Sequence, residues 1–321
     1  MNESTYQHLA KHIVKVEENV ASASLHALPV GGRMAYYTVA HDSVELVQAV
    51  KAATDIALPY LVIGHSGSTI IHDDGFPGLV IHNQSKNIAF SVEQSQMVVE
   101  TGVSLQSAIV QAAGRGLGGL IHLYGAGGSM GGALYYNASV QNQPLSDSLR
   151  SLTILMPPTR IKPEPTIVRY KGSWLLSKAE PGLTRLQTLF LRSHGENLPI
   201  ILTAQLQLTS LRLDELSRRL QTATNTFNDS LPGKDFFGPL FSDLPTQSAT
   251  EIMATAEAWR LKHPGFVLSK SHPNYVSVKN RFLRDHQGSV PVAELLTYVS
   301  QVQSWVYERT ALELQPAFLV H

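Results

Sequence analysis

The sequence has no cysteine among its 321 residues. Disulfide bonds, thiolate metal sites and thiol nucleophiles are therefore all excluded. A charge imbalance is also missing, because 25 Lys and Arg side chains are matched by 25 Asp and Glu, and no blocks of like charge occur. Since a protein that tracks a phosphate backbone needs clustered positive charge, nucleic acid is not an expected partner.

Long apolar runs are equally absent. No stretch approaches the roughly 20 apolar residues that a membrane-spanning helix needs. The first twenty residues, MNESTYQHLAKHIVKVEENV, lack the charged start, apolar middle and small-residue cleavage site of a secretory signal. These absences predict a cytoplasmic protein with no membrane partner.

Apolar residues make up 43% of the chain, enough for two or three domains at this length. The first part reads as strand, helix and further strands, with Asp42 as a helix cap, which is a βαβ-like order. Alternating, strand-like segments follow up to residue 208, and a third, α+β part is expected from about 209 to 310. Individual segments predicted by periodicity include a helix over 1–20, a strand over 167–176, a helix over 246–261 and a closing strand over 311–321.

Glycine is concentrated in one stretch, residues 119–147, GLIHLYGAGGSMGGALYYNASVQNQPLSD. Five glycines lie within eight residues there: Gly125, Gly127, Gly128, Gly131 and Gly132. Such density indicates positive φ angles or the close approach of another group to the backbone. Because no Lys or Arg occurs from residue 117 to 149, an anion bound here would be held by main-chain N–H groups. The alternative is a structural loop packed against a neighbouring strand.

A second loop of small residues, Gly64-His65-Ser66-Gly67-Ser68-Thr69, follows an apolar strand. Its hydroxyl and amide groups suit phosphate oxygens, although it has neither the lysine of a P-loop nor the spacing of a dinucleotide fingerprint. A serine-rich hairpin loop is the alternative interpretation. If both loops bind one diphosphate, they must converge in space.

Several motifs occur together in one order along residues 25–321. They are LPVGG (28–32), VIGHSGSTII (62–71), GAGGSMGGALYYNA (125–138), LSD (145–147), YKGS (170–173), KDFF (234–237), SKSHPNYV (269–276) and ELQPAF (313–318). In this order they resemble the UDP-N-acetylenolpyruvoylglucosamine reductases (UDP-N-acetylmuramate dehydrogenases), flavoenzymes of bacterial cell-wall precursor synthesis.

The resemblance implies an α+β fold with a two-part FAD-binding region of the vanillyl-alcohol-oxidase type and a C-terminal substrate domain. The implied boundaries are 1–86 for the first part of the FAD region, joined by the closing strand 311–321, then 87–208 for its second part and 209–310 for the substrate domain. FAD would contact residues of both loops. They are Gly64, His65, Ser66, Gly67, Ser68, Thr69, Ile70, Gly128, Ser129, Gly131, Gly132, Ala133 and Asn137.

The chain departs from the family at the residues that carry the chemistry. The family's arginine, proton-donating serine and glutamate correspond here to Lys171, Asp235 and Ala317. Lys171 keeps the positive charge but loses the planar guanidinium fork. Asp235 donates a proton only if burial or a neighbouring carboxylate keeps it neutral. The resemblance therefore implies Lys171 and Asp235 as catalytic candidates in a reorganised site.

The resemblance also implies a nucleotide-sugar substrate, contacted by Tyr170, His272 and Asn274, and NADPH as electron donor. The alternative for His272 and Asn274 is a hairpin whose side chains bond the backbone. Some oxidases of the wider flavin superfamily attach FAD through a histidine in the first loop, which leaves His65 as a candidate for covalent attachment. Because the three family positions are changed, the hypotheses are a divergent reductase with reduced or altered activity, a non-catalytic flavin-binding paralogue, and a fold relic that binds neither ligand.

Overall fold

The computed structural model describes residues 4–25, 28–65, 69–140, 143–158, 162–175, 177–180, 183–184, 198–230, 236–244, 247–286 and 288–321. Contacts within the chain define two compact units, each assembled from segments that are distant in the sequence. The first unit comprises Met1–Glu17, Tyr36–His65 and Gly78–Asn228, and the second comprises Glu18–Ala35, Ser66–Pro77 and Asp229–His321.

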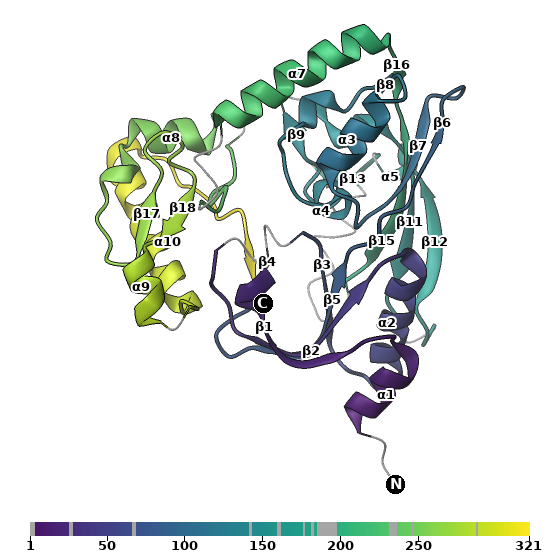
Figure 1. Cartoon of the computed structure of the whole chain (residues 1–321), viewed down its shortest axis with the longest axis horizontal. Coiled ribbons are helices and arrows are strands. Elements are labelled where there is room, and N and C mark those ends of the chain that lie inside the picture. The colour runs from purple at the N-terminus through teal and green to yellow at the C-terminus, as the bar shows by residue number, and fades with distance from the viewer. Residues whose placement is uncertain are drawn as a thin grey trace. The chain divides into compact units, whose positions relative to one another are not determined.

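A five-stranded antiparallel sheet forms the centre of the first unit, with strand order β12-β11-β15-β7-β6 (Figure 1). Its strands are β6 (Ile88–Ser91), β7 (Gln96–Glu100), β11 (Leu149–Met156), β12 (Thr166–Lys171) and β15 (Ile200–Gln207). Alternate residues such as Met97, Leu152 and Ala204 are completely buried, so one face of the sheet forms a core. The helices α3 (Leu105–Ala113) and α4 (Met130–Tyr135) pack on that face.

A second sheet has the order β1-β2-β5-β3. Its strands are β1 (Glu17–Ala21), β2 (Arg33–Ala40), β3 (Tyr60–Ile63) and β5 (Phe76–Asn83). The helix α2 (Ser43–Asp55) connects β2 to β3, and β3 pairs in parallel with β5, in agreement with the predicted βαβ-like opening. Asp42 caps α2 as expected, since its Oδ1 accepts from the amides of Val44 and Glu45, both at 2.8 Å.

The second unit contains the C-terminal helices α8 (Ala249–Thr255), α9 (Asn280–Asp285) and α10 (Val292–Thr310), together with the antiparallel pair β17 (Phe266–Leu268) and β18 (Val276–Val278). Buried aromatic and aliphatic side chains from these elements, including Phe241, Phe266 and Tyr298, form its core. The last strand, β19 (Leu319–Val320), pairs in parallel with β4 (Thr69–Ile70).

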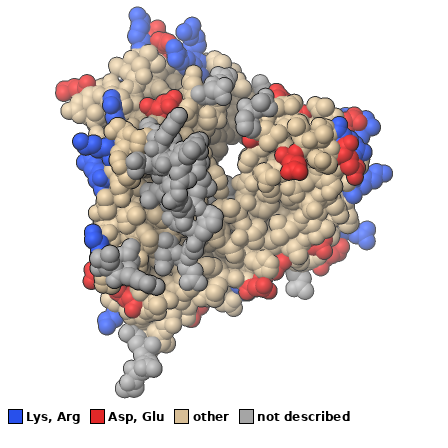
Figure 2. Space-filling model, turned by 180° about the vertical axis from the view of Figure 1, so that it is seen from behind, with Lys and Arg blue, Asp and Glu red and all other residues tan. Residues whose placement is uncertain are grey.

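The remaining elements are short, apart from α7. They are α1 (Thr5–His12), η1 (Ser22–Leu25), β8 (Leu117–Gly118), η2 (Ile121–Leu123), β9 (Ser139–Val140), β10 (Gln143–Pro144), η3 (Leu145–Ser148), α5 (Gly172–Leu175), β13 (Lys178–Glu180), β14 (Leu183–Thr184), β16 (Thr209–Ser210), α7 (Leu213–Ser230) and η4 (Ala258–Arg260). None of the described helices has the length and apolar composition needed to cross a bilayer. On the face drawn in Figure 2, basic and acidic side chains both lie around the margins and neither sign forms a broad field.

The predicted α+β class is confirmed, whereas several predicted segments were too long. The helix expected over 1–20 ends at His12 and is followed by β1. The strand expected over 167–176 ends at Lys171, where α5 begins with Gly172. In the region expected to be one helix, α8 gives way to η4 after Glu257 takes a left-handed φ of 49°. The division into three domains stays a prediction.

Candidate cofactor site

The glycine-rich stretch, residues 119–147, contains the short helix α4. Ser129 caps this helix, with its Oγ accepting from the amide of Gly132 at 3.2 Å. Met130, Ala133 and Leu134 belong to the core of the first unit, and their spacing is that of one face of a helix. Of the predicted cofactor residues, Ala133 is therefore mainly a core residue, whereas Gly132 is exposed.

The segment that follows β7 holds the other side of the stretch. The amide of Gly131 donates to the carbonyl of Thr101 at 2.8 Å, and the amide of Met130 donates to the carbonyl of Val103 at 2.7 Å. In the opposite direction, the amide of Leu105 donates to the carbonyl of Gly128 at 3.1 Å. The loop is therefore fixed at Gly128, Met130 and Gly131 by backbone hydrogen bonds alone.

Gly127 and Gly128 lie differently from the packed glycines. Both have left-handed φ angles, +71° and +74°, and a Cβ added to either would meet nothing within 4 Å. Within the part of the chain that the structure describes, their amides donate to no acceptor. These two adjacent amides are exposed and no side chain covers them, so an anionic group can approach the backbone here.

The two predicted loops approach one another at Gly64 and Ser129. Gly64 follows β3 directly, and a Cβ added to it would lie 2.3 Å from the Oγ of Ser129. Glycine is therefore required at position 64 by the closeness of the second loop. His65 is exposed. Thr69 and Ile70 form β4, while Ser66, Gly67 and Ser68 lie outside the described residues.

Asn137 closes the glycine-rich stretch. Its φ of 50° is left-handed, and its Oδ1 accepts from the amide of Ser146 at 3.1 Å, which joins the end of α4 to η3. Just before it, burial raises the pKa of Tyr135 and of Tyr136. Both phenols therefore remain uncharged hydrogen-bonding groups at neutral pH.

Tyr170 and Lys171 are adjacent in β12 and therefore point to opposite faces of the sheet. Tyr170 packs against the core of the first unit and stacks on Trp174, with ring centroids 4.9 Å apart and 16° between the planes. Lys171 is exposed and pairs with Ser151. The core side carries the glycine-rich stretch, so the structure brings Tyr170, and not Lys171, to that side.

The remaining predicted site residues belong to the second unit. Asn274 is only 2% exposed, and its amide group bonds both backbone groups of Phe241, donating to the carbonyl at 2.8 Å and accepting from the amide at 2.9 Å. These contacts are the ones expected from the alternative interpretation, in which the side chain of Asn274 bonds the backbone. His272 is half-buried, with Nδ1 3.0 Å from the Oγ of Ser271. Ala317 donates its amide to the carbonyl of Leu240 at 2.8 Å, and Asp235 lies outside the described residues.

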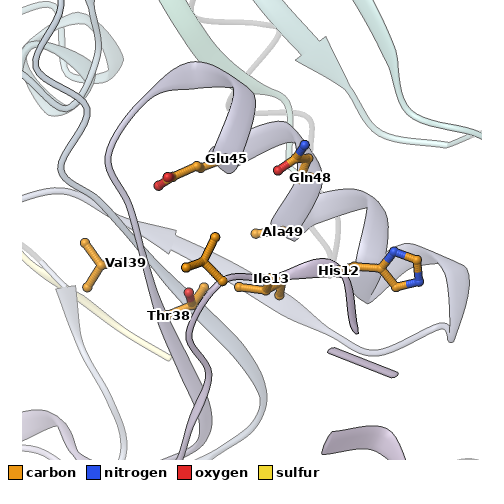
Figure 3. A pocket seen from close by; sticks show the side chains of 8 residues that line it. His12, Ile13, Thr38, Val39, Glu45, Gln48 and Ala49 are labelled. Atoms are coloured by element: carbon orange, nitrogen blue, oxygen red, sulfur yellow. The ribbon is translucent and has the colours of Figure 1, made fainter. Parts of the chain in front are cut away.

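A small hollow between α1, β2 and α2 does not contain any of the predicted site residues (Figure 3). Its lining includes His12, Thr38 and Glu45. The carboxylate of Glu45 accepts from the amide of His41 at 2.7 Å, so this group is already engaged in the structure around α2.

Two contacts of the glycine-rich stretch escaped prediction. Thr101, whose carbonyl accepts from the amide of Gly131, directly follows β7 and belongs to no motif singled out in the sequence. Phe227, near the end of α7, packs so closely on Gly125 that an added Cβ would lie 2.4 Å from its Cδ2. No spacing or composition signal links positions 125 and 227, because the contact joins segments that are distant in sequence.

The chain is similar to known proteins in sequence and in fold. Residues 34–161 match the family of FAD binding domains. The chain is 26% identical over 305 residues to the UDP-N-acetylenolpyruvoylglucosamine reductase of Synechococcus sp. (strain JA-3-3Ab), covering 94% of this chain and 90% of that protein. It is 33% identical to the reductase of the same name from Gloeobacter violaceus, over 44% of this chain and 48% of that protein.

Among solved structures, the UDP-N-acetylenolpyruvylglucosamine reductase of Thermus caldophilus has a TM-score of 0.69 at 22% identity, covering 95% of this chain and 98% of that one. This likeness shows a common fold. The predicted resemblance is therefore confirmed, and the chain is similar over most of its length to UDP-N-acetylenolpyruvoylglucosamine reductases.

Proposed function

We propose that the protein is an FAD-dependent oxidoreductase of the UDP-N-acetylenolpyruvoylglucosamine reductase type, using NADPH to reduce a UDP-N-acetylglucosamine enolpyruvate. The observation that carries this proposal is the pair of open amides at Gly127 and Gly128, beside the contact of Gly64 with Ser129. It lies in a chain that resembles such reductases over 94% of its length. The three-domain division, with a substrate domain over 209–310, belongs to the same proposal.

The residues of this site fit the diphosphate of FAD. With no Lys or Arg from residue 117 to 149, backbone N–H groups and hydroxyls would hold the negative charge. Gly64 would bring the first loop close enough for both loops to reach one diphosphate, and Gly128, Ser129, Gly131 and Gly132 would face the cofactor. Bound FAD would supply hydride transfer between NADPH and the enolpyruvyl group.

The chain's own residues would bind the substrate and manage its charge. Tyr170, held in place by its stack on Trp174, and the half-buried His272 would contact the nucleotide sugar. Lys171 remains the candidate cation for developing enolate charge, and Asp235 the candidate proton donor. The exposed position of Lys171 on the other face of β12 gives this assignment no support, so the activity of a Lys171→Ala variant is a necessary test.

Two measurements on the purified protein test the proposed function. The first is its absorption spectrum, in which we expect the flavin bands of bound FAD. The second is NADPH oxidation by the flavin-loaded protein, which should depend on added UDP-N-acetylglucosamine enolpyruvate. Flavin bands without substrate-dependent oxidation would reject the reductase and indicate a flavin-binding paralogue. A colourless protein whose melting temperature is unchanged by FAD would reject both.

A further inference from the structure

Thr101 connects the end of β7 to the glycine-rich stretch through a buried hydroxyl. The residue is 2% exposed. Its carbonyl accepts from the amide of Gly131 at 2.8 Å, and its own amide donates to the carbonyl of Leu202 at 3.1 Å. Its Oγ1 donates to the carbonyl of Ile201 at 2.5 Å. One residue therefore joins β15 to the loop.

Asn83, the last residue of β5, completes this connection. It is 4% exposed, and its Nδ2 donates to the Oγ1 of Thr101 at 3.1 Å. Its Oδ1 accepts from the amide of Ser85 at 3.1 Å, and the Oγ of Ser85 accepts from the amide of Gly102 at 2.9 Å. The hydroxyl of Thr101 thus accepts from one strand and donates to another, which determines its orientation.

A buried polar chain of this kind has few alternative arrangements, because each group that loses its partner is left unsatisfied away from water. Gly131 packs directly against Thr101, so a shift of Thr101 would also move the loop. A Cβ added to Gly131 would lie 3.1 Å from the Cβ of Thr101, so the two residues are in direct contact. From Gly131 the loop continues through Met130, bonded to Val103, to Gly128, bonded to Leu105.

We propose that Thr101 is a positioning residue for the cofactor: its hydroxyl, held between Asn83 and Ile201, sets the place of the open Gly127 and Gly128 amides that bind FAD. The inference rests on the proposed function. Thr101 itself does not touch the cofactor and acts through Gly131. Removing its hydroxyl should therefore weaken FAD binding more than it weakens the fold.

The test compares three substitutions in the full-length protein after removal of flavin. Thr101→Val keeps the shape and removes the hydroxyl, while Thr101→Ser keeps the hydroxyl. Thr38→Val is the matched control, because Thr38 is also 2% exposed and its Oγ1 donates to a backbone carbonyl, that of Lys15, at 2.7 Å. The measurements are the FAD dissociation constant from quenching of flavin fluorescence, the circular dichroism of bound flavin, and the melting temperature of the flavin-free protein.

We expect Thr101→Val, which removes both hydrogen bonds of the hydroxyl, to weaken FAD binding by about tenfold and to change the flavin dichroism. Thr101→Ser should restore both to within about twofold of the wild type. Thr38→Val should lower the melting temperature about as much as Thr101→Val does, while leaving the FAD dissociation constant unchanged. If Thr101→Val does not fold, Asn83→Ala removes one donor to the same hydroxyl and should weaken binding by about threefold.

The outcomes separate the inference from the function on which it rests. A wild-type protein that fails to bind FAD overturns the proposed function, and the inference with it. A wild-type protein that binds FAD, with Thr101→Val binding as tightly as Thr38→Val, overturns the inference and leaves the function standing. The same conclusion follows if Thr101→Ser fails to restore the flavin dichroism.

Discussion

Gly31-Gly32 and Gly127-Gly128 are adjacent glycine pairs with opposite surroundings. At the first pair, an added Cβ would lie 2.2 Å from the Oγ of Ser22 at Gly31 and 1.9 Å from the carbonyl oxygen of His72 at Gly32. At the second pair, an added Cβ would meet nothing within 4 Å. One pair is closed by protein atoms, whereas the other presents its backbone to open space.

The difference shows that glycine density alone does not identify a binding loop. At Gly32 the absent side chain lets two backbone segments touch, and the amide of Gly32 donates to the carbonyl of Ile71 at 2.9 Å. At Gly127 and Gly128 the absent side chains leave the amides accessible. Both residues have left-handed φ angles, which glycine adopts without strain. Substitutions should therefore affect stability at the first pair and ligand affinity at the second.

Gly32→Ala should produce the largest effect. Its Cβ would overlap a backbone carbonyl, which cannot move aside as a flexible side chain can, so we expect a loss of about 3 kcal/mol in the free energy of unfolding. Urea denaturation of the purified variant measures this loss. FAD affinity of the remaining folded protein should stay close to that of the wild type. A fully stable Gly32→Ala variant would contradict the closed packing of this pair.

Gly128→Ala should have the converse effect. The left-handed φ costs an alanine about 1 kcal/mol of stability. The added methyl group would also occupy the space above the open amides, so we expect FAD binding to weaken by about tenfold, or about 1.4 kcal/mol. Titration of the flavin-free protein with FAD measures the change. Unchanged affinity would show that this open pair does not face the cofactor.

Local sequence was sufficient to predict features that depend on neighbouring residues. The cap of α2 at Asp42 is an example, because capping acts over a few positions. The glycine-rich stretch was also interpreted from its local composition, and its role as a cofactor loop stays a prediction. Its composition indicated a bare backbone, although the contact between Gly64 and Ser129 was needed to place the two loops together.

Long-range contacts explain what could not be predicted. Lys171 was expected in the site from its motif; alternation along β12 places it on the opposite face from Tyr170, and its catalytic role stays a prediction. Asn274 bonds the backbone of Phe241, 33 residues earlier, so its motif alone does not distinguish a ligand contact from a structural one. Thr101 acquires its importance from Asn83 and Ile201, which reach it only through the folding of three strands.

Asp73→Ala should have a smaller effect near the closed pair. The carboxylate of Asp73 accepts from the amides of Val292 at 2.7 Å and Ala293 at 3.0 Å, at the start of α10. Loss of these contacts leaves two first-turn amides without that acceptor, and we expect about 1 kcal/mol of lost stability. Thermal unfolding measures it, with Asp73→Asn as a control that keeps one acceptor. Equal stability of both variants and the wild type would contradict this capping role.

The smallest expected effect is acid sensitivity in the unit that contains the closed pair. His263 is 8% exposed, and its Nδ1 accepts from the amides of Gly265 at 3.1 Å and Phe266 at 3.2 Å. Burial lowers the pKa of His263, and nearby Lys279 lowers it further against the opposing effect of Glu294. The folded state therefore takes up a proton less readily than the unfolded chain does.

As the pH falls through about 6.5, the unfolded state binds protons that the folded state still resists, so the free energy of unfolding should decrease. The loss should continue until the pH passes the lowered pKa of the folded state. His263→Asn supplies a non-titrating oxygen that can accept from the same amides. Between about pH 8 and pH 5, the range in which histidine titrates, the melting temperature of this variant should fall less steeply than that of the wild type. Because repacking around the smaller side chain lowers stability at every pH, the slope is the informative measurement. Identical slopes for the variant and the wild type would assign the acid sensitivity to other groups.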